Sequence, residues 1–200
     1  MAKPLPSQTA IANVLLKLVK LPSFNIDDVL SRSEFLIKNV CYEQALLNYW
    51  IAIEQVCRDL VIYDKALSNA TALWIKQERK LSAKCQNIDL KKHNLEGQLF
   101  DLIFTHSKSF YEAQYRYINI EEVRKALTTF NISFNPNSVN YLLANEIKEL
   151  PESLNSKSKV TIRSIRNKVV HEAYIFKEDD FELIKSFPYE FLVMISGLTK

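Results

Sequence analysis

The longest hydrophobic pattern in the chain is a run of apolar side chains at alternating steps of four and three residues. Its members are Tyr42, Leu46, Tyr49, Ile53, Val56, Leu60, Tyr63 and Leu67. This spacing keeps them on one face of an α-helix and is typical of helices packed nearly antiparallel to their neighbours. Trp50, Cys57 and Val61 widen the face, as the interior of a helix bundle requires. The pattern predicts one long helix, which residues 70–90 continue.

Apolar periodicity predicts further helices on both sides of this segment. They cover residues 8–20, a stretch starting at Asp27 or Asp28, and residues 95–115, 120–130, 136–150, 160–174 and 181–198. Pro136 suits the first turn of a helix because its missing N–H would be unpaired there. Pro188 should kink or split the last helix. We find no internal repeat and no alternating pattern typical of a β-strand, so the predicted fold class is all-α.

The chain length and the apolar content favour one domain. A length of 200 residues fits a single domain, and 48% hydrophobic residues supply ample material for a core. We expect this domain to span residues 1–200, with an N-terminal helical extension at 1–22. Residues 159–200 should form two further elements: a helix that carries the candidate functional residues, described below, and the final helix. Before them, residues 151–158 are polar.

Composition argues against several kinds of site. Only Gly97 and Gly197 are glycines, which disfavours glycine-rich phosphate loops. The three cysteines are widely spaced and form no CxxC pair, so we expect free thiols in a reducing cytosol and neither a disulfide framework nor a zinc site. The net charge of +3 permits nucleic-acid binding without arguing for it. The apolar stretch near the N-terminus is too short and interrupted to span a bilayer, and a cytoplasmic protein is expected.

The most unusual polar pattern is RSIRNKVVHEA at residues 163–173. On a helical wheel of about 100° per residue, one stripe faces the core: Ile162, Ile165, Val169, Ala173 and Phe176. The polar side chains fall on the arc that faces away from this core: Arg163, Arg166, Asn167 and His171. Val170 lies in the middle of that arc, where a solvated face has little use for an apolar side chain. Either a partner covers this face, or it is a solvated face with an incidental histidine.

Residues 166–171, RNKVVH, resemble the Arg-x(4–6)-His signature of the HEPN superfamily, whose four-helix domains occur in prokaryotic toxins, CRISPR effectors and anti-phage systems. In that family a polar residue, often asparagine, follows the arginine, as Asn167 does here. The layout is also similar, with long early helices and a late motif helix before a final apolar one. Many members have glycine after the histidine, where this chain has Glu172. This departure affects the expected geometry of the following turn more than the expected chemistry. The resemblance implies a HEPN-like four-helix bundle with additional helices.

The resemblance also implies RNA cleavage without a metal ion, by attack of a ribose 2′-OH on the adjacent phosphorus. Such a reaction needs a base, an acid and a cation for the charge at phosphorus. His171 suits either proton role, and the planar guanidinium of Arg166 suits phosphate oxygens. Asn167 could orient the imidazole or the phosphate, and Arg163 is a candidate RNA contact. No Asp, Glu and His cluster near the motif has metal-ligand spacing, so we expect neither a metal nor another cofactor.

One motif supplies a single histidine, whereas a base–acid pair uses two. HEPN domains resembling this chain pair their motif helices across a two-fold axis, which implies a homodimer with a composite site and would bury Val170. The expected partners are therefore an RNA substrate, a second copy through the motif helix and, for a toxin or anti-phage effector, an antitoxin protein. No membrane partner is expected. Glu54 faces away from the apolar seam of the long helix and is a candidate neighbour of the motif helix.

Two other functions stay open. The chain could be a non-catalytic HEPN-like module that binds RNA, a nucleotide or a protein partner. It could also be a structural helical bundle in which the motif arises by chance. His93 and His106 have no supporting motif, and the basic face between Lys76 and Lys84 is most simply a solvated one.

Overall fold

The computed structural model describes residues 25–84, 95–117, 119–144 and 161–196, and all regular elements in these ranges are α-helices. In chain order they are α2 (Ile26–Lys38), α3 (Tyr42–Lys84), α4 (Leu95–Gln114), α5 (Ile120–Thr129), α6 (Pro136–Leu143), α7 (Ile162–Glu172), α8 (Glu178–Ile184) and α9 (Ser186–Ser196). The all-α prediction is confirmed. The helix predicted at 8–20, residues 85–90 of the predicted long helix and the polar segment 151–158 lie outside the described residues.

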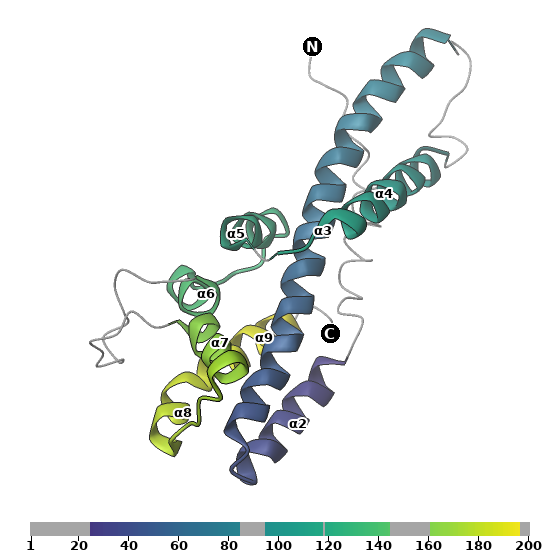
Figure 1. Cartoon of the computed structure of the whole chain (residues 1–200). Coiled ribbons are helices and arrows are strands. Elements are labelled where there is room, and N and C mark those ends of the chain that lie inside the picture. The colour runs from purple at the N-terminus through teal and green to yellow at the C-terminus, as the bar shows by residue number, and fades with distance from the viewer. Residues whose placement is uncertain (1–24, 85–94, 118, 145–160, 197–200) are drawn as a thin grey trace.

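Helix α3 is the element against which the others are arranged. Its 43 residues extend over about 65 Å at 1.5 Å per residue. Figure 1 shows α2 beside its N-terminal half and α4 beside its C-terminal half, with α5 and α7 on the opposite side. The predicted apolar seam is buried along its length, apart from Leu67, which is partly buried and packs against the core. The predicted long helix and its buried face are therefore confirmed.

Helix α2 starts close to the predicted position and is tied to α3 by polar contacts. Its N-cap is Asn25, whose Oδ1 accepts a hydrogen bond from the backbone N–H of Asp27 at 3.0 Å. The expectation that Asp27 or Asp28 starts the helix is therefore off by one or two residues, and both aspartates lie in the first turn. Asn48 of α3 donates through Nδ2 to the hydroxyl of Ser33 at 2.8 Å.

The C-terminal part of the chain differs from the prediction in helix length. Helix α6 starts at Pro136 as predicted but ends at Leu143 instead of near residue 150. The last apolar segment is split as Pro188 predicts, since α8 ends at Ile184 and α9 begins at Ser186. Pro188 lies in the first turn of α9, where its missing N–H removes no intrahelical bond.

The described cysteines fit the expectation of free thiols. Cys57 is fully buried and Cys41 is partly buried, and neither is in a disulfide. Burial raises the pKa of the Cys57 thiol well above its usual range, so this side chain acts as a small apolar group in the core. None of the described helices is both long enough and apolar enough to cross a membrane.

Candidate active site

Helix α7 carries the motif and begins with a capping box. The backbone N–H of Ser164 donates to Oγ1 of Thr161 at 3.1 Å, and the N–H of Thr161 donates to Oγ of Ser164 at 3.1 Å. A cap of this kind stabilises a helix start by about 1 kcal/mol. Because Thr161 and Ile162 are fully buried, the start of the motif helix is fixed in the core.

The end of α7 is two residues earlier than predicted. Glu172 is the last helical residue, and Ala173 follows in the left-handed conformation with φ 50°. The N–H of Tyr174 donates back to the carbonyl oxygen of Lys168 at 3.4 Å. A non-glycine residue pays about 1 kcal/mol for this conformation, and Ala173 is exposed. The prediction that Ala173 continues the core stripe is wrong, because the chain leaves the helix at this residue.

The segment after α7 is held against the start of α3. The N–H of Phe176 donates to Oε1 of Glu43 at 2.6 Å. The ring of Phe176 is buried and lies edge-on to Tyr174 and Phe181, with centroids 5.4 and 5.5 Å away. Phe176 is thus buried as predicted, but by this turn and not by a continued helix. The C-terminal end of the motif helix is therefore anchored as well.

Arg166 points toward α3. Its Nη2 lies 3.5 Å from Oε1 of Glu54, and its guanidinium lies 5.5 Å from the ring centroid of the buried Trp50. Nη1 donates to Oδ1 of Asn167 at 2.9 Å. The side chain is only 25% exposed, so the prediction that Arg166 faces away from the core is wrong. The predicted approach of Glu54 to the motif helix is confirmed.

Asn167 and His171 face outward, as the helical wheel predicts. Both are exposed, and Asn167 lies beside Arg166, whose guanidinium it accepts from. Among the described residues no hydrogen bond joins Asn167 to His171. His171 lies five positions after Arg166, about 7.5 Å along the helix axis and about 140° around it. Within one chain, contacts with α3 therefore hold Arg166 in place, whereas His171 is exposed and accessible to a ligand or to a second copy of the chain.

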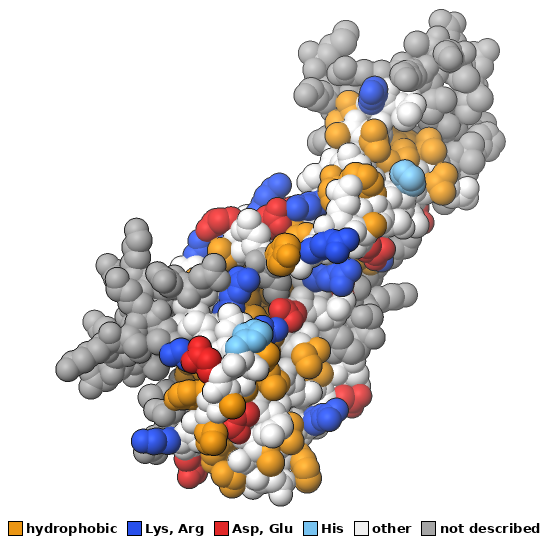
Figure 2. Space-filling model, viewed as in Figure 1, with side chains coloured by type: hydrophobic (Ala, Val, Ile, Leu, Met, Phe, Trp, Pro, Cys, Tyr) orange, Lys and Arg blue, Asp and Glu red, His pale blue; other side chains and the backbone are white. Residues whose placement is uncertain are grey.

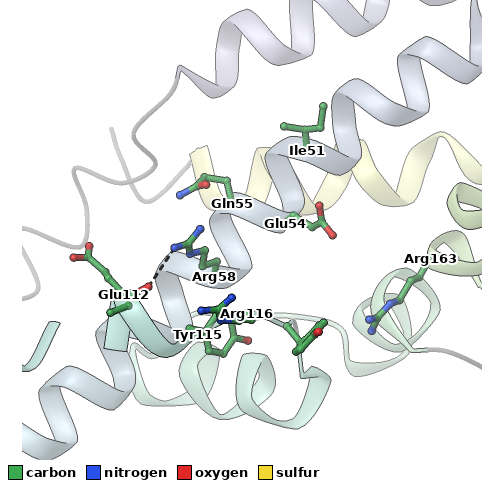
Figure 3. Close-up of a pocket in the computed structure, with 10 residues that line it drawn as sticks. Ile51, Glu54, Gln55, Arg58, Glu112, Tyr115, Arg116 and Arg163 are labelled. Atoms are coloured by element: carbon green, nitrogen blue, oxygen red, sulfur yellow. Dashed lines mark hydrogen bonds between the residues drawn. The ribbon is translucent and has the colours of Figure 1, made fainter. Parts of the chain in front are cut away.

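Arg163 lines a cleft beside the motif helix. Figure 2 shows Lys and Arg side chains gathered where α4 ends and α5 and α7 approach α3. Figure 3 shows the residues that line the cleft. Its volume is about 640 Å³. Arg58 of α3 and Arg116, just after α4, also line it. Nη1 of Arg163 donates to the carbonyl oxygen of Leu143 at 3.3 Å. Arg163 thus also caps α6, where a cation complements the helix dipole.

Three residues beside the candidate site residues are not among those predicted from the sequence: Trp50, Arg58 and Arg116. The sequence pattern places Trp50 in the core only, whereas one face of its ring contacts the guanidinium of Arg166. Glu54 and Arg58 are four residues apart, which puts them on one face of α3, so Arg58 could have been found with Glu54. Arg116 lies in a segment without periodicity, and no sequence signal connects it to α7.

Comparisons of the chain with protein-family models, curated proteins and solved structures find no match. Within residues 25–84, 95–117, 119–144 and 161–196, no group of three or more His, Cys, Asp or Glu side chains is placed to hold a metal ion.

Proposed function

We propose that this chain is a HEPN-like endoribonuclease that cuts RNA without a metal ion, with Arg166 and His171 as its catalytic residues. One observation carries the proposal: α7 presents an exposed histidine and an ordered arginine, and the arginine is paired with Glu54, which lines a cleft that also holds three arginines. The resemblance of residues 166–171 to the HEPN signature supports a role as a toxin or anti-phage effector. An antitoxin protein is the regulator that such a role would imply.

Arg166 is suited to hold the phosphate that reacts. Its hydrogen bond to Asn167 uses one of the five guanidinium N–H donors, and Glu54 forms an ion pair with Nη2 at 3.5 Å. The planar guanidinium therefore keeps further donors for phosphate oxygens. Because Trp50 and Glu54 order the side chain before RNA binds, less entropy is lost when it meets the charge developing at phosphorus.

Proton transfer is assigned to His171. In the proposed reaction the imidazole accepts the proton of the 2′-OH as its oxygen bonds to phosphorus. A second imidazole donates a proton to the 5′-oxygen as the P–O bond to it breaks. The products are a 2′,3′-cyclic phosphate and a 5′-hydroxyl, and no oxidant or added nucleophile is needed.

A second copy of the chain would supply the second imidazole. Val170, next to His171, is 49% exposed, and Ile175 just beyond α7 is also exposed. An apolar surface therefore adjoins the histidine. A two-fold contact through α7 would bury Val170 and bring the two copies of His171 near the axis, so the proposed state is a homodimer.

Val170→Asp tests this contact. We expect the variant to sediment as a folded monomer and to lose RNA cleavage, because two carboxylates would meet in a dry interface. Val40→Asp is the matched control, since Val40 is an exposed valine in the turn between α2 and α3. It should remain an active dimer. A wild-type protein that is active as a monomer at the assay concentration would contradict the shared site.

The chemistry is tested by cleavage of a single-stranded RNA in excess EDTA. We expect discrete fragments that end in a cyclic phosphate or a 3′-phosphate, and no fragments from the same sequence with 2′-fluoro sugars. The second substrate is the control, because it lacks the attacking hydroxyl. Cleavage that stops on chelation and returns with a divalent metal would rule out the proposed reaction.

The contacts of Arg166 also favour a second function, that of a non-catalytic HEPN-like module that binds RNA, a nucleotide or a protein. In this case Arg166 serves to tie α7 to α3 through Glu54 and Trp50. Binding of RNA without fragments, both in EDTA and with added Mg²⁺, would support this second function over the first.

A further inference from the structure

The cleft beside α7 gathers three arginines from separate parts of the chain. Arg58 extends from α3, Arg116 from the segment after α4 and Arg163 from α7, and all three line the same space (Figure 3). Like charges that share one cleft repel each other. An anionic ligand would relieve this repulsion, so the arrangement favours one.

The two carboxylates of the cleft do not neutralise Arg58 or Arg116. Glu54 is paired with Arg166, as described above. Oε1 of Glu112 lies 3.0 Å from Nζ of Lys108, one turn earlier on α4. Nη2 of Arg58 donates to the backbone carbonyl of Glu112 at 3.4 Å, and not to its carboxylate. Each carboxylate thus pairs with a cation other than Arg58 and Arg116, and neither of these two guanidinium groups is neutralised by a carboxylate that lines the cleft.

Aromatic side chains and the size of the cleft indicate which anion it takes. Tyr117 is 82% exposed, so a face of its ring is open to a planar base. The Tyr115 hydroxyl is neutral, and burial raises its pKa to about 12. A volume near 640 Å³ is in the range that encloses a small organic ligand. Unpaired bases stack on aromatic rings and guanidinium planes, whereas duplex RNA is read by its shape.

We propose that this cleft binds a single-stranded segment of the RNA substrate, with Arg58 and Arg116 on phosphates and a base stacked on Tyr117. The inference rests on the proposed function in one respect, namely that the ligand is the RNA cut at the motif. Glu54 lines the cleft and contacts Arg166, so a strand held in the cleft leads to the motif arginine. The preferred substrate is therefore unpaired RNA.

Binding of a fluorescent single-stranded 2′-fluoro oligonucleotide tests this without cleavage. For a single strand, each phosphate contact adds about 0.7 to the slope of log affinity against log salt. We expect Arg116→Gln to lower this slope by about 0.7, and the double variant Arg58→Gln with Arg116→Gln to lower it by about 1.4. Arg32→Gln, at an exposed arginine of α2, is the matched control and should leave the slope unchanged.

Tyr117→Ala should weaken binding about tenfold at constant salt, because one base loses its stacking partner. Tyr117→Phe keeps the ring and should bind like the wild type. If the double variant fails to fold, Arg116→Gln still decides the matter, since Arg116 is exposed.

The outcomes separate this inference from the proposed function. If the slopes of the arginine variants are unchanged while the wild type still cuts RNA, the proposal that the cleft binds RNA is wrong and the proposed ribonuclease function stands. If the slopes are lower but the wild type never cuts RNA, the cleft binds RNA and the proposed ribonuclease function is wrong. Displacement of the oligonucleotide by an equal concentration of AMP, or equal affinity for a duplex of the same length, would contradict binding of a single strand.

Discussion

His171→Ala is expected to lower RNA cleavage by about 10²- to 10⁴-fold, the usual contribution of a general acid or base, while the melting temperature stays nearly unchanged. His171 is exposed at the end of α7 and has no hydrogen bond with another described residue. Removing its imidazole therefore removes proton transfer and little packing. Single-turnover cleavage in EDTA and thermal unfolding measure the two effects. Near-normal cleavage by this variant would exclude His171 from the chemistry.

Arg166→Ala should also lower RNA cleavage, but unlike His171→Ala it should lower the stability of the protein as well. We expect a similar loss of cleavage together with a loss of about 1–2 kcal/mol in the free energy of unfolding, because the contacts with Trp50 and Glu54 disappear. Arg166→Lys is the control, since it keeps the charge but lacks the planar fork. It should recover part of the stability and little of the cleavage. Full activity in Arg166→Lys would show that the fork is not needed.

Ile53→Asp is expected to lower the free energy of unfolding by several kcal/mol, comparable with the whole stability of a typical domain. Ile53 is fully buried on the seam of α3. The change removes apolar contacts and buries a carboxylate without a partner. Denaturant unfolding followed by circular dichroism measures the loss.

The matched control for this prediction lies two residues away on the same helix. Ile51 is 68% exposed, so Ile51→Asp should change stability by no more than about 0.5 kcal/mol. Equal stability of the two variants would show that the seam of α3 does not face the core.

The helices could be predicted because their apolar period is long and regular, and α3 is the clearest example. The end of α7 could not, since Ala173 takes the left-handed conformation without the glycine that usually signals it. The direction of the Arg166 side chain could not be predicted either. A helical wheel gives the direction of a Cβ atom, whereas the long side chain of Arg166 turns back so that its guanidinium lies over the Trp50 ring of the neighbouring helix α3. The meeting of Arg58 with Arg116 depends on how α3 packs against α4, which no local pattern reveals.

The central claim is that Arg166 and His171 act in one site shared by two copies of the chain. A heterodimer of one wild-type chain and one His171→Ala chain, isolated through two different tags after co-expression, tests it directly. If the base and the acid come from opposite chains, loss of one imidazole disables the shared site. We predict that this heterodimer cuts RNA in EDTA about 10²- to 10⁴-fold more slowly than the wild type. A heterodimer that keeps about half of the wild-type rate, as expected if each chain works alone, would contradict the shared site.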